Sequence, residues 1–367
     1  MPLTLLLHGR HAPGDVLYQS LGPWLVPWRF GSFEAEYAAL RGGIALLDAS
    51  TQALIEVRGA DRTRFLQALL TSDVSTLTAG TGCRGALLDP VAKLIAPLLV
   101  LADAESLWLL CDVDRAAAVT ETLERYHFSE DVHLTNHERA QAAFALQGPG
   151  ALAMASRLAG RSLPLEHAGD HAFATVETIP TRFVRHQLTD EVGVLCLVPA
   201  AQAPAVWDAW SQRASAWGLT PIGWDALNTA RIEAGIPWFG LDMDQSTLLP
   251  ETGLEDALAS ETKGCYVGQE IIARMRTYGS ASKKLMGLAC AGTSVPAPGD
   301  TMIRDGAEVG RVTSACWSPS LRRPLGLGYV KRGAYEPGTT VQIVSERGRI
   351  PATVVSRPPV TRLASSG

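Results

Sequence analysis

The sequence predicts an α+β protein that ends in a small β-barrel. Residues 31–280 alternate between segments of helical period and segments of strand period, with neighbouring strands joined by short turns. This pattern is typical of antiparallel sheets that pack against helices. Beyond Lys284 the pattern changes to short strands and frequent turns, as in a small barrel. The length of 367 residues favours two or three domains.

The elements before the barrel follow from periodicity and turn signals. The first 30 residues are rich in Pro, Gly and Trp and are expected to form an irregular lead. Apolar residues at helical spacing predict helices over residues 33–47, 61–70, 114–126, 151–158, 203–217 and 222–235. Strands are expected over residues 53–57, 85–101, 106–112, 143–147, 173–179, 181–186 and 193–199.

The barrel is expected over residues 281–356. Its strands are predicted at residues 285–288, 301–313, 326–330, 339–344 and 350–355. Asp305-Gly306 is a strong hairpin signal because both residues tolerate the positive φ of a tight turn. Residues 357–367 are polar and Pro-rich, so they are expected to be a frayed tail.

Composition excludes several classes of protein. Hydrophobic residues make up 47% and charged residues 19%, so global disorder is not expected. The net charge of −5 gives no support to a nucleic-acid partner. The most apolar stretch, residues 94–102, is too short to span a membrane, and the N-terminus lacks the basic start of a signal peptide. The sequence therefore predicts a soluble cytoplasmic protein.

The cysteines give no metal signature. Six cysteines are scattered singly, at positions 83, 111, 196, 265, 290 and 316, and no C-x-x-C pair occurs. This spacing predicts neither a zinc ribbon nor a cradle for an iron–sulfur cluster. Single cysteines suit a reducing cytoplasm better than a disulfide scaffold.

One segment combines residue types that a buried helix or strand would not need. Residues 263–270, called the octet below, read Lys-Gly-Cys-Tyr-Val-Gly-Gln-Glu and run into a short predicted helix at residues 271–276. Glycines suit tight backbone geometry or close approach to a ligand. A cysteine beside a helix start and a lysine is well placed to form a thiolate. The octet is therefore predicted to be the functional centre.

Each octet residue has a functional and a structural interpretation. Cys265 is the candidate catalytic residue, as a nucleophile, a transient cluster ligand or a redox sensor, or else it is a small buried hydrophobe. Lys263 is expected to lower the pKa of that thiol or to bind an anion, or else to be a solvated surface lysine. Tyr266 either stacks on a planar ligand or packs in the core. Gly264 and Gly268 are also candidates for ligand binding, but they are expected to shape the turn rather than to contact the ligand directly. Gln269 and Glu270 are expected to combine a role in the binding pocket with capping of the helix.

Two further features lie outside the octet. Arg231 could clamp an anionic ligand, or it could form a structural ion pair between domains. Asp242 and Asp244 alternate as metal-binding carboxylates can, but no further ligand spacing supports an ion. No bound metal is therefore predicted.

Several stretches, in the same order, resemble the folate-binding glycine-cleavage T-protein. They are residues 57–61, 65–67, 72–74, 146–149 and 231–237. The octet resembles the signature of a sister branch, the YgfZ family, whose members support iron–sulfur proteins. The resemblance covers residues 30 to 355 and implies a three-domain, ring-like fold with tetrahydrofolate or a related folate in a central opening. It also implies two intertwined α+β domains over residues 31–280, followed by the barrel.

Two positions depart from the T-protein pattern. Ala96-Pro97 stand where the T-protein has the aspartate that handles the aminomethyl group, so no residue there can transfer the proton. Leu195 stands where the T-protein holds the pterin ring with a glutamate, and leucine cannot accept the pterin's hydrogen bonds. A shift of the alignment would bring Glu191 to this position. Lys93 matches a lysine of the sister branch and joins the expected folate-binding residues.

The sequence thus predicts a folate-binding accessory protein for iron–sulfur cluster assembly or repair, rather than a conventional enzyme. Cys265 would act on a client or carrier protein, and that partner would supply most cluster ligands because one cysteine cannot hold a cluster. One alternative is a tetrahydrofolate-dependent aminomethyl or one-carbon transferase. Another is a non-catalytic folate-binding scaffold. Neither a nucleic-acid nor a membrane partner is expected.

Overall fold

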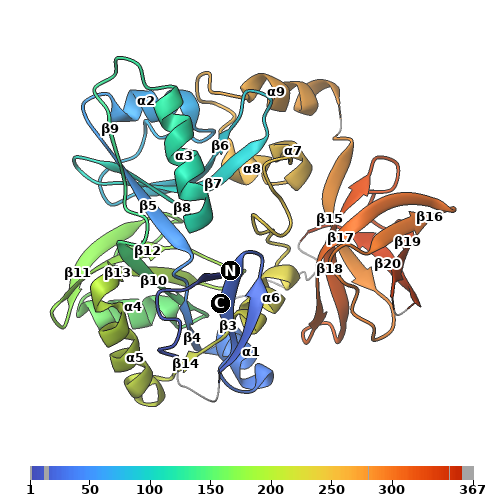
Figure 1. Ribbon diagram of the computed structural model, residues 1–367, viewed down its shortest axis with the longest axis horizontal. Coiled ribbons are helices and arrows are strands. Elements are labelled where there is room, and N and C mark those ends of the chain that lie inside the picture. Colours follow the sequence, from blue (N-terminus) through green and yellow to red (C-terminus); the bar gives the residue numbers. More distant parts are fainter. Residues whose placement is uncertain (1, 12–15, 280, 347, 358–367) are drawn as a thin grey trace. The chain divides into compact units, whose positions relative to one another are not determined.

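The computed structural model describes residues 2–11, 16–279, 281–346 and 348–357, and the chain divides into two compact units (Figure 1). The first unit comprises residues 1–227 and 256–269, and the second comprises residues 228–255 and 270–367. The predicted tail lies outside the described residues apart from Arg357.

Three sheets form the framework of the first unit, as far as its described residues show. The largest has the order β11 (His171–Val176), β12 (Ile179–Arg185), β13 (Gly193–Pro199), β10 (Gln141–Gln147), β4 (Ile44–Asp48) and β14 (Leu219–Pro221). The second has the order β6 (Gly82–Leu88), β7 (Leu94–Ala102), β8 (Leu107–Asp112), β5 (Gln52–Arg58) and β9 (His133–Asn136). The smallest has the order β1 (Leu3–Thr4), β3 (Trp24–Arg29) and β2 (Leu17–Leu21).

Helices cover these sheets and complete the core. They are α1 (Phe33–Gly42), α2 (Arg62–Leu69), α3 (Val113–Arg125), α4 (Ala151–Ala159), the 3-10 turn η1 (Ala200–Gln202) and α5 (Ala203–Trp217). One core gathers Phe144 of β10, alternate residues of β13 and the indole rings of Trp207 and Trp210 on α5. Because strand side chains alternate between faces, Leu195 on β13 lies on the face opposite this core.

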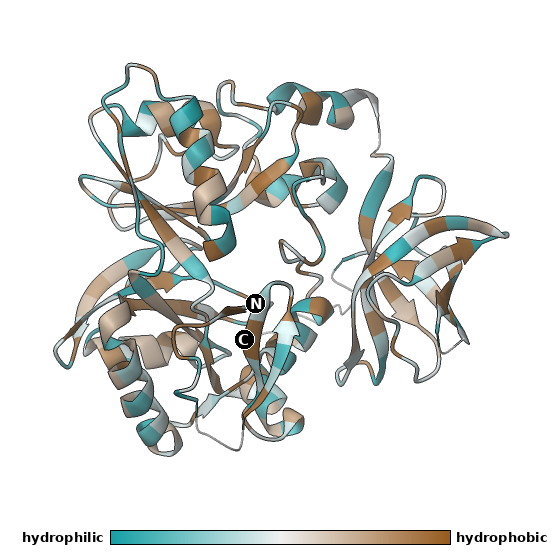
Figure 2. Cartoon of the chain, viewed as in Figure 1, coloured by the Kyte–Doolittle hydropathy of each residue, from teal (hydrophilic) through white to brown (hydrophobic). Residues whose placement is uncertain are grey.

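The second unit is built around a closed barrel. Its strand order is β15 (Lys283–Cys290), β18 (Arg323–Lys331), β17 (Ala307–Ser318), β16 (Thr301–Arg304), β19 (Thr340–Ser345) and β20 (Gly348–Val355). Hydrophobic and hydrophilic residues alternate along these strands, which places one set inside the barrel (Figure 2). Asp305 and Gly306 have φ of 51° and 80° and join β16 to β17, which confirms the predicted hairpin.

The remaining helices lie, along the sequence, at or near the points where one unit ends and the other begins. They are α6 (Trp224–Glu233), α7 (Leu249–Thr252), α8 (Glu255–Leu258) and α9 (Gln269–Tyr278). Helix α9 contains the short helix predicted at residues 271–276. The predictions of an α+β fold and a C-terminal barrel are therefore confirmed.

Three local predictions differ from the structure. The lead predicted to be irregular contains β1, β2 and β3, because Trp24 and Val26 alternate toward a buried face. The helix predicted to run to residue 47 ends at Gly42, and Ile44 already pairs with Leu219 in the sheet. The strand predicted over residues 85–101 is broken by a turn at residues 89–93, which separates β6 from β7.

Candidate functional site

Lys263 of the octet is an internal anchor. Its ammonium donates hydrogen bonds to the carbonyl oxygens of Gln67 (2.7 Å), Leu70 (2.6 Å) and Ser72 (2.8 Å), at and just beyond the C-terminal end of α2. An ammonium has three N–H donors, so all three are used. A helix C-terminus also carries partial negative charge and unpaired carbonyl groups, both of which favour a cation there. The sequence predicted that Lys263 activates Cys265, whereas the structure directs it to the backbone of α2.

The thiol coupled to Lys263 is a different cysteine. Burial lowers the pKa of Lys263 to about 8, while the charges of Asp73 and Cys83 oppose that shift. Cys83 is half-buried on β6, and burial raises the pKa of its thiol. Sequence reasoning missed Cys83 because this electrostatic influence depends on the fold that brings β6 near Lys263 and on no local motif.

Tyr266 is 8% exposed, and its ring centroid lies 5.3 Å from the Lys263 ammonium. A cation at this distance from an aromatic face is attracted by the ring quadrupole. Tyr266 therefore takes the packing role that the sequence left open. Gly264 is exposed, and an added side chain would meet no atom within 4 Å, so no close approach requires a glycine there.

Gly268 lies directly against the turn between β6 and β7. Its φ is +83°, and a Cβ atom there would lie 2.9 Å from the carbonyl oxygen of Asp89 and 3.2 Å from the Cα of Ala92. Both the backbone conformation and the contact favour glycine. The octet therefore rests on the turn that also carries Lys93, so the structure brings these two predicted elements together.

Asp89 shapes that turn. Its carboxylate Oδ1 accepts hydrogen bonds from the backbone N–H groups of Val91 (2.9 Å) and Lys93 (2.8 Å). Ala92 has φ of 63° and is fully buried, so the turn holds a conformation that is unusual for alanine. The sequence signal for this role is the Asp-Pro pair at positions 89 and 90, which favours a turn.

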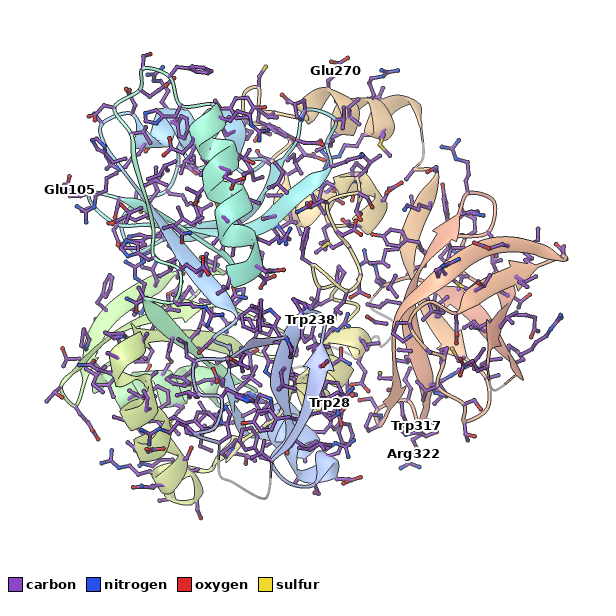
Figure 3. All side chains as sticks on the ribbon, viewed as in Figure 1. Trp28, Glu105, Trp238, Glu270, Trp317 and Arg322 are labelled. Atoms are coloured by element: carbon purple, nitrogen blue, oxygen red, sulfur yellow. The ribbon has the colours of Figure 1, made fainter. Side chains whose placement is uncertain are left out.

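Cys265 lies between these fixed neighbours and is exposed to solvent. The other cysteines differ, because Cys83 is half-buried and the remaining four are buried. Gln269 and Glu270 form the first turn of α9, as the sequence predicted, and Glu270 is exposed (Figure 3). A carboxylate in the first turn complements the helix dipole. The octet thus presents one accessible thiol on a loop with two anchored ends.

Arg231, predicted as a possible clamp for an anionic ligand, is buried within the second unit. Its side chain is 1% exposed and donates to Asp242, to Ser314 Oγ (2.7 Å) and to Asn228 Oδ1 (2.9 Å). Asp242 also accepts from Thr313 Oγ1 (2.6 Å). The guanidinium therefore has no accessible edge for a ligand. Its ion pair is structural, but it lies within the second unit and not between domains as the sequence alternative proposed.

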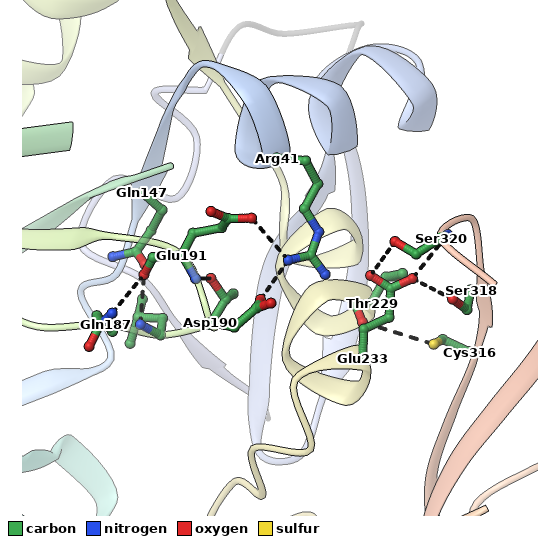
Figure 4. A network of polar contacts seen from close by, with 12 residues as sticks. Arg41, Gln147, Gln187, Asp190, Glu191, Thr229, Glu233, Cys316, Ser318 and Ser320 are labelled. Atoms are coloured by element: carbon green, nitrogen blue, oxygen red, sulfur yellow. Dashed lines mark hydrogen bonds and ion pairs between the residues drawn. The ribbon is translucent and has the colours of Figure 1, made fainter. Parts of the chain in front are cut away.

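The neighbouring carboxylates also accept hydrogen bonds from residues of the protein. Glu233 accepts hydrogen bonds from Ser318 and Ser320 (Figure 4). Asp244 accepts from Ser246 and Thr247 within its own turn. Among the residues that the structure describes, no group of three or more His, Cys, Asp or Glu side chains is arranged to hold a metal ion.

None of the described helices is long and apolar enough to cross a membrane.

Of the two positions considered for the pterin contact, Leu195 has no carboxylate and the carboxylate of Glu191 is already hydrogen-bonded. Leu195 is 1% exposed and pairs with Ala145 and Val184 within its sheet. The carboxylate of Glu191 accepts a hydrogen bond of 3.3 Å from Arg41 (Figure 4). A pterin presents adjacent donors that a carboxylate accepts in pairs; Leu195 cannot provide that contact, and the Glu191 carboxylate already accepts from Arg41. Ala96 on β7 is fully buried and apolar, so it cannot handle a proton.

Comparison with known proteins accounts for nearly the whole chain. Residues 7–262 match the family described as "GCVT N-terminal domain", and residues 283–360 match the "Glycine cleavage T-protein C-terminal barrel domain". The octet lies between these two ranges. The chain is 31% identical to the aminomethyltransferase of Synechococcus sp. (strain CC9311), over 92% of this chain and 93% of that protein. It is 29% identical to the aminomethyltransferase of Bacillus subtilis (strain 168), with the same coverage.

A solved structure shares the fold. The glycine cleavage system aminomethyltransferase T from Bartonella henselae aligns with a TM-score of 0.87 at 23% identity, over 98% of both chains. The relatives are named as enzymes, so the prediction that this chain is not a conventional enzyme has no support from them. None of these matches points to the YgfZ branch or to iron–sulfur proteins. The chain belongs to the glycine-cleavage T-protein family.

Proposed function

We propose that this protein is a tetrahydrofolate-dependent one-carbon transferase of the T-protein family. The observation that carries the proposal is the relation along the whole chain to proteins named aminomethyltransferase, through both family domains in order. Tetrahydrofolate would accept or donate the one-carbon unit. The first candidate for the transferred unit is the aminomethyl group for which those relatives are named.

Two positions limit what carries over from the family. Ala96 and Leu195 are buried and apolar, so neither proton transfer nor a carboxylate contact to the pterin is assigned to them. Asp89, the nearest acid before Ala96 in the sequence, uses its carboxylate within its own turn. We therefore propose one of two differences from the glycine-cleavage enzyme. Either the one-carbon donor is a different molecule, or the leaving group of the donor receives its proton from solvent.

Turnover with tetrahydrofolate tests this proposal. The protein is incubated with tetrahydrofolate and an aminomethyl donor, and the methylene-tetrahydrofolate formed is quantified against a reaction without protein. Product formed above that background supports a transferase. Saturable binding of tetrahydrofolate without turnover of any one-carbon donor would instead favour the non-catalytic scaffold, and absence of binding would remove folate from the account.

A second function is favoured by one specific observation at Cys265. Its thiol is exposed while its loop is held by Lys263 on one side and Gly268 on the other, and the octet lies outside both family matches. This arrangement would suit a factor that maintains iron–sulfur clusters by presenting a thiol to the cluster of a client or carrier protein. The partner would supply the other ligands.

A rescue experiment tests this second function. The activity of a [4Fe–4S] enzyme is measured in a strain that lacks this gene and is rescued with the wild-type chain, Cys265→Ala or Cys83→Ala. Rescue by wild type and Cys83→Ala, but not by Cys265→Ala, supports it. Equal rescue by all three chains would show that the exposed thiol is dispensable, and no rescue by wild type would contradict the cluster assignment.

A further inference from the structure

The outer face of the barrel carries a groove that the proposed function does not use. It has a volume of about 390 Å³ and is lined by residues of β15, β17 and β18 together with Leu241, Pro298 and Gly299. All of these residues belong to the second unit. The groove is large enough for a small molecule, since ligand pockets begin at roughly 300 Å³.

Three cations line this groove from three neighbouring strands. Lys283 on β15 is the direct cross-strand partner of Lys331 on β18, and Arg311 on β17 is the partner of Tyr329 on β18. Like charges directly opposite each other destabilise a sheet. The repulsion between these cations is unfavourable in the free protein, and an anion bound between them would turn it into attraction.

The acidic side chains nearby leave Arg311 and Lys331 largely without neutralisation. Glu308 is the single carboxylate that lines the groove, and it lies 3.9 Å from Arg311, with both side chains about half exposed. The exposed pair of Arg311 and Glu308 contributes little. Lys283 lies 3.8 Å from Glu251, whose side chain is 7% exposed, so this cation is partly neutralised. Lys331 donates to the carbonyl oxygen of Glu308 (3.0 Å), which leaves two of its three donors for a ligand.

The groove also has an apolar wall. The Tyr329 ring lies beneath the Lys283 ammonium, at 4.7 Å from its centroid, and Leu241 lines the groove as well. An aromatic face of this kind contacts an apolar or planar body, while the surrounding cations contact anionic groups. We propose that this groove binds a small organic polyanion, with two or more carboxylate or phosphate groups on an apolar body.

Calorimetric titration of the full-length protein tests the proposal. Citrate serves as the carboxylate probe and pyrophosphate as the phosphate probe, in a buffer free of both anions. The variants are Arg311→Gln and Lys331→Gln, and Arg349→Gln on β20 is the control with the same change of charge outside the groove. Each groove variant should weaken binding about tenfold, because each removes a charged hydrogen-bond donor, and the control should bind as wild type does.

The two probes distinguish the sources of the anion. Tighter binding of pyrophosphate indicates a phosphate-bearing ligand, and tighter binding of citrate indicates a polycarboxylate. The proposal is overturned if neither probe binds, or if Arg349→Gln weakens binding as much as the groove variants do. The first result would mean that the groove does not bind polyanions, and the second that the cations act only through net charge.

Discussion

Replacement of Lys263 by methionine tests whether the octet is anchored to α2 through hydrogen bonds. Methionine keeps most of the volume of the lysine stem but removes the donor from three carbonyl groups, those of Gln67, Leu70 and Ser72. A buried acceptor left without a partner costs at least about 1 kcal/mol. The expected loss is therefore about 3 kcal/mol for the three carbonyls together. For a unit of this size, it corresponds to a fall in Tm of roughly 6–12 °C.

Thermal and urea unfolding, followed by circular dichroism, measure this loss. Lys93→Met is the matched control, because Lys93 is partly exposed and lies in the same unit. It should change the free energy of unfolding by no more than about 0.5 kcal/mol. A loss of less than about 1 kcal/mol for Lys263→Met would contradict this anchoring role, since a single carbonyl left without a partner should cost that much.

Three further predictions concern other parts of the chain. Gly268→Ala should destabilise the protein by about 1–3 kcal/mol and change the rate at which iodoacetamide alkylates Cys265. Gly264→Ala is the control and should do neither, because only Gly268 combines φ of +83° with contact to Asp89. Arg231→Met should cost about 3–5 kcal/mol in urea unfolding by leaving Asp242 buried and unpaired, and adding Asp242→Leu should recover part of the loss; no recovery would argue against the ion pair. Burial, aided by the Arg84 cation, lowers the pKa of His186 to about 4. The stability that the neutral ring contributes above pH ~6.5 should therefore be lost as the pH falls toward 4, and His186→Gln should flatten this part of the stability–pH curve.

The sequence predicted the parts of the fold that depend on local patterns. Asp305-Gly306 adopts the positive φ that a hairpin requires, and the short strands and frequent turns beyond Lys284 predicted the barrel. Ile44 shows the limit of such patterns. The helical spacing of apolar residues continues to Ile44, but Ile44 belongs to a strand because it pairs with Leu219, far away in the sequence.

The candidate site was harder to predict because its contacts are distant in sequence. Nothing near Lys263 indicates that its partners lie at Gln67, 196 residues earlier, or that Arg231 meets Ser314, 83 residues later. Both residues are charged and were therefore interpreted as functional, yet both are buried anchors. Gly264 and Gly268 are indistinguishable by residue type, and only the turn at Asp89 shows which of them must be glycine.

The formation of a one-carbon derivative of tetrahydrofolate, measured with purified wild-type protein and with Cys265→Ala, tests the central claim most directly. A folate-dependent transferase of the T-protein family predicts that product forms with both proteins, because the claim assigns no step to the thiol. Absence of product with the wild-type protein, across aminomethyl and other one-carbon donors, would contradict it.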